Sequence, residues 1–337
     1  RNAGFRIHAD APALGLGALA CALLVLRRKD SVLGISMAAL AAVLSVWTKQ
    51  VMVPLLAAMA VYLWAAEGNK VLRRYMGWVL FWGLFVSALF ICMFGAEPLF
   101  ISMFYIPGRH ALRHGWFLDS VIKLSRECIL PLTVAGAFFP VFKKMEWKNP
   151  VLFIRQNRWV LFLITALFLV PTSILGNGKV GGSNNTLSYT GYFLLAGLTF
   201  ALVESENFEW RSAVFVLIVL LGIQIPSVYY RFHKLQKEKN YPQVVFDYVK
   251  KYPGKGYFPR LNALNIMADK KVYHSSFGMI DRSWARLPVT QEHFRAHLPE
   301  RMDFWAFREG TNDDKQYLDL PEFWFITSDQ ELPGFKV

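Results

Sequence analysis

An imidazole and a carboxylate lie two residues apart near the start of the chain, at His8 and Asp10. Asp10 directly precedes a long apolar run, so its carboxylate would lie at a membrane edge and must be hydrated, paired or bound to a ligand. In a loop, the two side chains could face one ion or one sugar. The alternative is that Asp10 caps the following helix, because Pro12 suits a first helical turn. Both interpretations are open on the spacing alone.

A lysine separates two apolar runs further along the chain. Lys49 has only Thr48 and Gln50 as polar neighbours. Its ammonium group would therefore lie near one membrane surface, where a lone cation suits a lipid phosphate. The alternative is a lysine that snorkels to the surface and marks the end of a span.

Two arginines follow an aromatic stretch within residues 97–114, a pattern typical of a segment lying in the membrane interface. Arg109 and Arg113 are four residues apart, so a helix would place both on one face. There they could bind a phosphate or a pyrophosphate. Attraction to anionic lipid headgroups would explain the same charges without a specific site.

A loop rich in glycine and asparagine is predicted at residues 176–186. It contains four glycines, including Gly181 and Gly182, and continues with Asn184 and Asn185. Such glycines let backbone amides approach an anion or a sugar closely. A flexible connector would have the same composition. The segment is not a nucleotide P-loop, because it lacks the order GxxxxGK[ST].

The elements that must position these residues are apolar helices. Of the 337 residues, 54% are apolar and only 18% are charged, which is too apolar for a typical soluble domain. The apolar residues form runs close to the length that crosses about 30 Å of hydrocarbon. The fold class is therefore mainly α, with about eight transmembrane helices. These are predicted at residues 11–26, 31–47, 50–66, 75–95, 121–142, 158–176, 186–204 and 211–228.

Basic residues gather in the connectors on one side of this layout. The clusters are Arg27 to Lys29, Lys70 with Arg73 and Arg74, Lys143 and Lys144 with Lys148, Arg155 and Arg158, and finally Arg211. By the positive-inside rule, that side is cytoplasmic. Asp10, Lys49 and the loop at 176–186 would then face the extracytoplasmic side. The net charge of +13 thus reflects membrane topology and not nucleic-acid binding, since no basic stripe with interleaved exposed aromatics is present.

The chain turns polar after residue 230, which predicts a transmembrane domain at 1–230 and a soluble extracytoplasmic domain at 231–337. This second part shows helical and strand-like patterns in alternation, so we expect a small α/β module. The helical patterns are at 241–250 and 261–269, and the strand-like runs are at 256–258, 271–274 and 323–327. The module shows no catalytic triad, zinc spacing or cofactor-binding turn.

Three of these segments resemble motifs of the GT-C superfamily of polytopic glycosyltransferases, which includes protein O-mannosyltransferases and Rgt-like bacterial transferases. Residues 6–13, where Asp10 opens a span, look like the second extracytoplasmic acidic motif. Residues 44–50, followed by Pro54, look like the segment whose lysine lies near the lipid phosphate. Residues 179–185 are similar to a Gly-Gly-x-Asn loop of bacterial members.

The resemblance implies a multi-pass enzyme of the bacterial inner membrane with its C-terminal domain outside the cytoplasm. Such an enzyme moves a hexosyl or pentosyl group from a polyprenyl-phosphate donor to a glycan, lipid or protein acceptor. Lys49 would be the first cation at the leaving phosphate, followed by Arg109, Arg113 and Lys179. Asp10 and His8 would assist catalysis or bind a divalent metal ion.

Family members usually place their principal catalytic carboxylate in a loop after the first span, and no such loop precedes Asp10. We therefore expect that the chain is a fragment lacking an N-terminal segment, and that it is inactive alone. A transporter or lipid flippase is the main alternative. Transporters usually carry polar or broken helices at mid-membrane depth, whereas the polar groups here crowd one face.

Overall fold

The computed structural model is mainly helical and divides into two compact units. The described residues are 9–28, 31–137, 149–204, 229–230, 232–233, 240–258, 262–273, 278, 281–282, 284–287, 296–299, 304–305, 307–308 and 335–336. Unit 1 comprises Arg1–Phe104 and Ala111–Val216, and unit 2 comprises Tyr105–His110 and Leu217–Val337. The predicted boundary near residue 230 stays a prediction, because residues 205–228 and 234–239 lie outside the described part.

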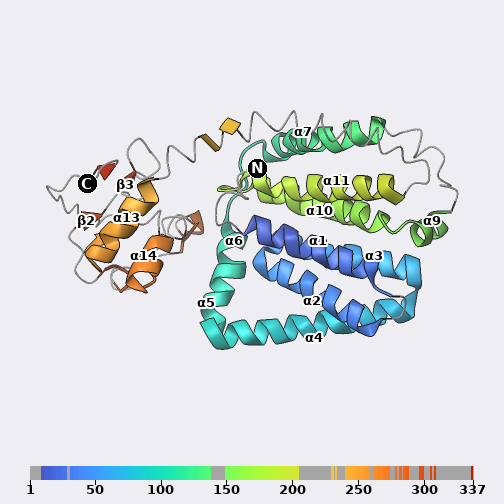
Figure 1. Cartoon of the computed structure of the whole chain (residues 1–337), viewed down its shortest axis with the longest axis horizontal. Helices are drawn as coiled ribbons and strands as arrows, with labels where there is room; N and C mark the ends of the chain where they lie inside the picture. The colour runs from blue at the N-terminus through green and yellow to red at the C-terminus, as the bar shows by residue number, and fades with distance from the viewer. Residues whose placement is uncertain are drawn as a thin grey trace. The chain divides into compact units, whose positions relative to one another are not determined.

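Unit 1 is a bundle of helices that run back and forth along one axis (Figure 1). Helix α1 packs on α2, α2 and α3 pack on α4, α3 packs on α10, and α7 packs on the α10–α11 pair. The elements are α1 (Asp10–Leu26), α2 (Val32–Thr48), η2 (Gln50–Met52), α3 (Val53–Glu67), α4 (Asn69–Phe94), α5 (Ala96–Phe100), the π-helical turn η3 (Ile101–Tyr105), α7 (Trp116–Ala137), α9 (Pro150–Gln156), α10 (Val160–Gly178), η4 (Asn184–Thr186) and α11 (Ser188–Glu204).

Four helical segments of unit 1 are long and apolar enough to cross a membrane. They are Gln50–Glu67, Asn69–Phe94, Val160–Gly178 and Asn184–Glu204. These segments correspond to the predicted spans at 50–66, 75–95, 158–176 and 186–204, which are confirmed as long apolar helices. These helices therefore support the conclusion that the chain is a membrane protein.

The other four predicted spans have different outcomes. Those at 11–26 and 31–47 form α1 and α2, which are apolar but only 17 residues long. The span at 121–142 falls partly in α7, which is less apolar and is not among the four long segments. Residues 138–142 and the whole span at 211–228 lie outside the described residues. The total of eight spans stays a prediction.

Local residues explain where several helices begin and end. Ser31 caps α2, because its hydroxyl accepts a hydrogen bond from the backbone N–H of Gly34. Gly68 joins α3 to α4 at φ 86°, a left-handed conformation that favours glycine. Gly95 ends α4 at φ 82° in the same way. These glycines allow sharp turns, so α3 and α4 pack against each other with a single residue between them.

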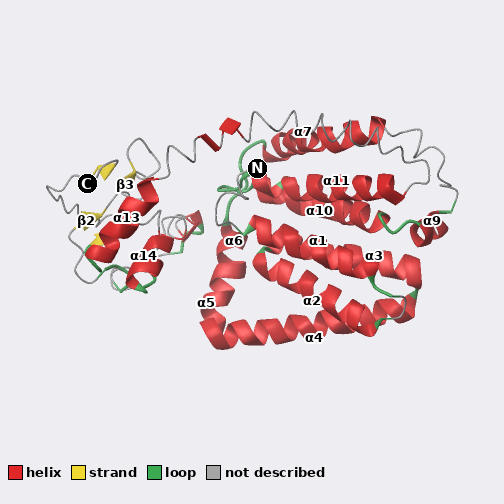
Figure 2. Ribbon diagram, in the orientation of Figure 1, coloured by secondary structure: helices red, strands yellow, loops and turns green. Residues whose placement is uncertain are grey.

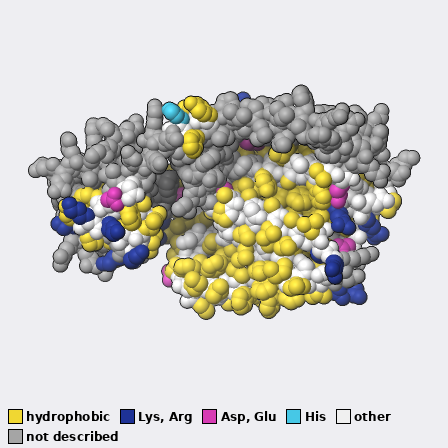
Figure 3. All heavy atoms as spheres, viewed as in Figure 1, with side chains coloured by type: hydrophobic (Ala, Val, Ile, Leu, Met, Phe, Trp, Pro, Cys, Tyr) yellow, Lys and Arg dark blue, Asp and Glu magenta, His cyan; other side chains and the backbone are white. Residues whose placement is uncertain are grey.

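The core of unit 1 lies between α1, α2, α3, α10 and α11, and includes Ile35, Leu63, Leu161 and Phe193. Helix α4 is different, because only 6% of its 18-residue apolar window is buried, although the window has a mean hydropathy of 2.1. Its exposed large side chains contribute to the hydrophobic surface in Figure 3. An apolar surface of this length is stable in lipid and would be unfavourable in water.

In its described residues, unit 2 combines short helices with two-residue strands (Figure 2). Helix α13 (Asn240–Lys251) and helix α14 (Asn262–Asp269) agree with the predicted helical patterns and pack on each other. Strand β1 (Gly256–Tyr257) pairs in parallel with β2 (Phe304–Trp305), and β3 (Phe307–Arg308) pairs antiparallel with β4 (Phe335–Lys336).

Two other strand predictions for unit 2 have different outcomes. Residues 271–273 form no regular element, so the strand predicted at 271–274 is wrong over these residues. The run at 323–327 lies outside the described residues. The α/β module itself stays a prediction.

Residues 105–110 also belong to unit 2, through α6 (Ile106–Arg109) and His110. The His110 Nε2 atom lies 3.3 Å from the backbone oxygen of Asp281 and 3.8 Å from its carboxylate. Partial burial raises the pKa of Asp281, and the nearby His110 opposes this rise. His110, near the end of the predicted interfacial segment, thus contacts Asp281, which lies 171 residues later in the chain.

The close packing of α1 can be tested at Gly17. A Cβ atom there would lie 2.6 Å from Cε of Met52 and 3.3 Å from the hydroxyl of Ser45. We expect Gly17→Val to destabilise the protein by about 1–3 kcal/mol, because the added methyl groups overpack this contact. Thermal unfolding in detergent measures the effect. Gly15→Val is the matched control, since no atom lies within 4 Å of a Cβ atom there. Equal losses in both variants would contradict close packing at Gly17.

Candidate functional site

A buried carboxylate, a lysine and a tyrosine meet at one end of unit 1. The Oδ1 atom of Asp10 accepts hydrogen bonds from Nζ of Lys49 and from the hydroxyl of Tyr189. The Lys49 ammonium also lies 5.6 Å from the centre of the Tyr189 ring, within reach of a cation–π interaction. Asp10 is 1% exposed, whereas the Lys49 side chain is 24% exposed. We call Asp10, Lys49 and Tyr189 the Asp10 cluster.

Three separate helices position the Asp10 cluster. Asp10 begins α1, Lys49 follows the last residue of α2, and Tyr189 lies in the first turn of α11. Lys49 has an extended backbone at φ −157°, which breaks the helical path between α2 and η2. Two hydrogen bonds hold this break in place: Ser45 donates to the carbonyl of Ala13, at 2.7 Å, and Thr172 donates to the carbonyl of Val51, at 3.0 Å.

The structure answers the question that the sequence left open about Asp10. The N-cap position of α1 is Ala9 and no side chain caps it, so Asp10 is paired rather than acting as the helix cap. Lys49 is therefore not the lone cation that the sequence suggested, because its ammonium group contacts the Asp10 carboxylate. His8 lies outside the described residues, and within the described ranges no three His, Cys, Asp or Glu side chains form a group that could hold a metal ion. A divalent ion at Asp10 and His8 stays a prediction.

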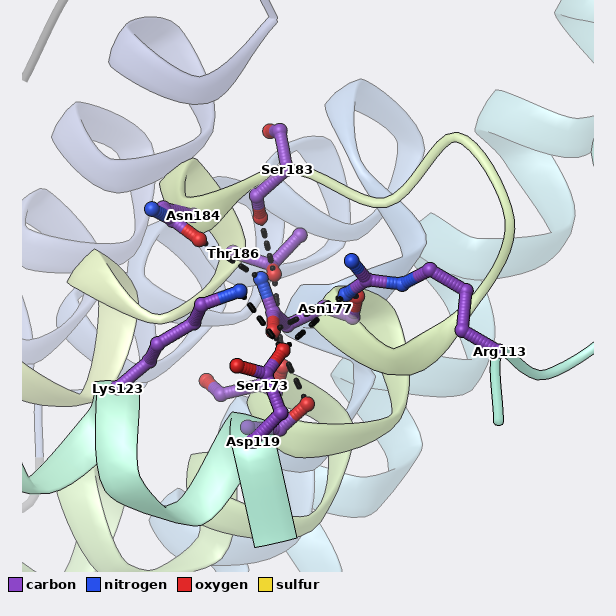
Figure 4. Close-up of polar contacts among 9 residues, drawn as sticks. Arg113, Asp119, Lys123, Ser173, Asn177, Ser183, Asn184 and Thr186 are labelled. Carbon is purple, nitrogen blue, oxygen red and sulfur yellow. Dashed lines mark hydrogen bonds and ion pairs between the residues drawn. The ribbon is translucent and has the colours of Figure 1, made fainter. Parts of the chain in front are cut away.

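A second polar cluster at the same end is built around Asn177 (Figure 4). Asn177 is 1% exposed, although it lies in the last turn of the apolar helix α10. Its Oδ1 atom accepts a hydrogen bond from Ser120 at 3.0 Å, and its Nδ2 group donates one to Asn184 at 3.1 Å. Its backbone oxygen accepts one from the Arg113 guanidinium. These four residues, the Asn177 cluster, connect α7, α10 and η4.

Additional charges surround the Asn177 cluster. Asp119 accepts a hydrogen bond from Lys123 at 2.7 Å and lies 3.8 Å from the Arg113 guanidinium. Arg113 and Lys123 thus share the Asp119 carboxylate, and the backbone of Lys179 pairs with that of Leu112 next to Arg113. The side chains of Arg113, Asp119 and Lys123 are each 30–45% exposed, so a ligand can reach them. The local excess of positive charge favours an anionic ligand.

The loop predicted at 176–186 is shorter than expected. Helix α10 continues to Gly178, and η4 begins at Asn184. A Cβ atom at Gly182 would lie 2.3 Å from the carbonyl oxygen of Gly176, and Gly181 has φ 78°. The glycines are therefore required for a tight turn against the end of α10. Asn184 contributes a side chain to the Asn177 cluster, whereas the backbone oxygen of Asn185 accepts a hydrogen bond from the Ser188 hydroxyl.

The helical clamp expected from Arg109 and Arg113 is wrong. Arg109 ends α6, whereas Arg113 lies in an extended segment of unit 1. That segment pairs with the end of α10: the N–H of Arg113 donates to Gly178, and the N–H of Val180 donates to Ala111. Backbone pairing replaces the helix that the four-residue spacing required. Arg109 instead stacks its guanidinium over the Tyr105 ring, 5.0 Å from the ring centre.

An apolar pocket of about 530 Å³ lies beside the turn that carries Lys49. Trp47 and Gln50, on either side of Lys49 in the chain, both line it. The opposite walls come from α4, α5 and η3, and include Ile91, Leu99 and Phe104. Gln50 donates a hydrogen bond to the carbonyl of Met103, which closes the wall between η2 and η3. The volume is within the range of small-molecule sites, and the lining is almost entirely apolar.

Sequence reasoning missed Tyr189, Asn177 and Ser120 as members of these clusters. Asn177 was visible as an amide at the end of an apolar run, where a buried polar group needs a partner. Tyr189 had a weaker signal, since tyrosines are common at the ends of membrane spans. No local pattern in the sequence connects either residue to its partners.

A double-mutant cycle tests the pairing of Asp10 with Lys49. We expect Lys49→Met to reduce the free energy of unfolding by about 3 kcal/mol, because the buried Asp10 carboxylate loses its ion pair with Lys49. The double variant Asp10→Asn with Lys49→Met should recover most of this loss, since no charge then remains. Chemical or thermal unfolding in detergent gives both values. Effects that simply add in the double variant would show that the two groups do not interact.

Loss of the amide in the Asn177 cluster should also destabilise unit 1. We expect Asn177→Ala to reduce the free energy of unfolding by about 1–3 kcal/mol, because the fully buried Ser120 hydroxyl loses its partner. Asn185→Ala is the matched control, because Asn185 makes no side-chain hydrogen bond to the described residues. A similar loss in both variants, measured in the same unfolding assay, would refute the role assigned to Asn177.

Comparison with known proteins identifies no relative from which a function could be inferred. A scan of protein-family models, a search of curated proteins and a search of solved structures find no match to the chain. The functional argument therefore rests on the Asp10 cluster, the Asn177 cluster and the apolar pocket between α2, α4 and α5.

Proposed function

We propose that the chain is part of a membrane glycosyltransferase that uses a polyprenyl-phosphate sugar as donor. One observation carries the proposal: Trp47 and Gln50, close to Lys49 in the chain, line an apolar pocket, while the ammonium of Lys49 is held by a buried carboxylate. A lipid-linked sugar has the matching chemistry, because an apolar chain adjoins a phosphate. The pocket would take the first part of the lipid chain, and Lys49 would lie near the phosphate.

The cations near this end fit the charge that develops during sugar transfer. In the proposed reaction, the bond between the anomeric carbon and the phosphate oxygen breaks, and an acceptor hydroxyl forms the new bond and releases its proton. The polyprenyl phosphate leaves with the electron pair, so negative charge grows on its oxygens. Positioned cations stabilise such charge most in a site that excludes water. Lys49 is the first candidate, and Arg113, Lys123 and Lys179 supply additional positive charge.

Asp10 acts as a positioning residue in this proposal. Its contacts with Lys49 and Tyr189 fix the ammonium group and neutralise it in the resting state. The pair carries no net charge, so a doubly charged phosphate needs the second group of cations as well. Asn184 is the exposed amide of the Asn177 cluster and can bind sugar hydroxyls. Arg109 is not included, because it belongs to unit 2.

Charge distribution supports an orientation for the proposed enzyme. Arg27 and Arg28 follow α1 at the end opposite Asp10, and Lys70, Arg73 and Arg74 lie in the first turns of α4. Arg155 belongs to α9, and Arg158 lies just before α10. Figure 3 shows Lys and Arg side chains gathered at one end of unit 1. By the positive-inside rule we assign that end to the cytoplasm, and the end with Asp10 and Asn177 to the outside. We propose the bacterial inner membrane as the location, with a glycan, lipid or protein as the acceptor and with the C-terminal domain outside the cytoplasm.

A transfer assay tests the proposal. The complete protein in nanodiscs is given radiolabelled polyprenyl-phosphate sugars and a membrane extract, and loss of the sugar from the lipid is measured. We compare Asp10→Asn, which keeps the ammonium group, with the double variant Asp10→Asn and Lys49→Met, which removes it without leaving a buried charge. The double variant should transfer at least about 100-fold more slowly than Asp10→Asn.

Two controls separate chemistry from folding. Lys70→Met removes a lysine at the opposite end of unit 1 and should leave transfer unchanged. Ala96→Trp places a bulky ring in the apolar pocket, and should weaken use of the lipid donor, whereas Leu80→Trp on the exposed face of α4 should not. Movement of the lipid across the membrane without cleavage of the sugar would instead identify a flippase. The absence of both activities in folded protein would refute the proposal.

A further inference from the structure

A second pocket, of about 550 Å³, lies at the opposite end of unit 1 and is lined by three arginines. Arg27 follows the last residue of α1, Arg155 belongs to α9, and Arg158 precedes α10. Tyr62 and Glu67 of α3 complete the polar lining. We call this space the arginine pocket. It is separate from the Asp10 cluster, because α1 begins at one site and ends at the other.

Each guanidinium of the arginine pocket is held in place by the protein. Arg27 forms an ion pair with Glu67, and its side chain is only 4% exposed. The Nε group of Arg155 donates to the carbonyl of Ala65 at 3.3 Å, and an Nη group of Arg158 donates to the carbonyl of Val25 at 3.4 Å. Both carbonyls lie in the last turns of their helices, where they have no partner within the helix. The side chains are therefore oriented before any ligand binds.

Capping of helix ends explains only part of this arrangement. Among the described residues, the buried Nε of Arg27 has no hydrogen-bond partner, and Arg155 and Arg158 form no ion pair. Three guanidinium groups face one carboxylate in the lining, and Glu204 adds a second carboxylate near Arg158. The pocket therefore keeps an excess positive charge, with N–H groups available to an acceptor. Arginines that served only as caps would not need to share one cavity.

We propose that the arginine pocket binds a phosphate group, with an anionic lipid headgroup as the source that fits best. Planar guanidinium groups bind phosphate through paired N–H···O contacts. Leu24, Val25, Ala66 and Val71 also line the pocket and offer an apolar surface beside the charges, which suits the glycerol and first methylene groups of a lipid. Basic pockets between the ends of membrane helices bind such headgroups in other proteins. The proposal does not depend on the glycosyltransferase function.

Lipid binding to the purified full chain tests this proposal. Phosphatidylglycerol and phosphatidylcholine are titrated separately, and bound lipid is counted by native mass spectrometry. We expect phosphatidylglycerol to bind at least about tenfold more tightly than phosphatidylcholine. The variant Arg155→Gln with Arg158→Gln should lose at least about tenfold in affinity for phosphatidylglycerol, because it removes charge-assisted hydrogen bonds. Arg155→Gln alone provides a milder variant if the double variant unfolds.

The matched control removes two arginines from the same end of unit 1. Arg73→Gln with Arg74→Gln changes the net charge equally, but neither residue lines the arginine pocket. This control should keep the affinity for phosphatidylglycerol. Inorganic phosphate, added in place of lipid, distinguishes the source: stabilisation by phosphate that depends on Arg155 and Arg158, without a lipid preference, would indicate a soluble phosphate ligand. Equal losses in both double variants, or no anion preference in any assay, would overturn the proposal.

Discussion

The burial of the Asp10 carboxylate is the constraint on which one end of unit 1, the end that carries Asp10, depends. A carboxylate that is 1% exposed needs a cation and hydrogen-bond donors close by, because transfer of an unpaired charge from water is very unfavourable. Lys49 and Tyr189 satisfy this need. The requirement brings the start of α1, the end of α2 and the start of α11 together. The ion pair also fixes the turn at Lys49, and the adjacent Gln50 lines the apolar pocket.

The same requirement connects stability with the proposed chemistry. A lysine that is held by a buried carboxylate has lost much of its conformational freedom before a ligand arrives, which reduces the entropy lost on binding. The Asn177 cluster provides comparable order around Arg113, through one amide and two backbone hydrogen bonds. Helices thus supply the frames, and the polar groups lie at the helix ends and in the short turns between them. The arginine pocket repeats this principle at the other end, where backbone carbonyls orient the guanidinium groups.

The helical architecture of unit 1 could largely be predicted from the sequence, because it follows from local composition. Apolar runs close to membrane thickness give helices wherever they occur, since a backbone in lipid must satisfy its own hydrogen bonds. The residues 50–66, 158–176 and 186–204 illustrate this, as do the glycines that allow sharp turns. Local reasoning failed at Arg113, where spacing indicated a helix but the chain pairs with Gly178 and Val180 instead.

What the sequence by itself determined is thus the apolar helices, their approximate limits, and the placement of Asp10, Lys49 and the glycine turn at helix ends. Only the tertiary structure decided that Asp10 contacts Lys49 and Tyr189, which are 39 and 179 residues away, and that Asn177 joins Arg113, Ser120 and Asn184. The physical reason is the range of the interactions. Helix formation in an apolar run depends on neighbouring residues, whereas the partner of a buried polar group depends on which helices pack together, and no local pattern encodes that choice.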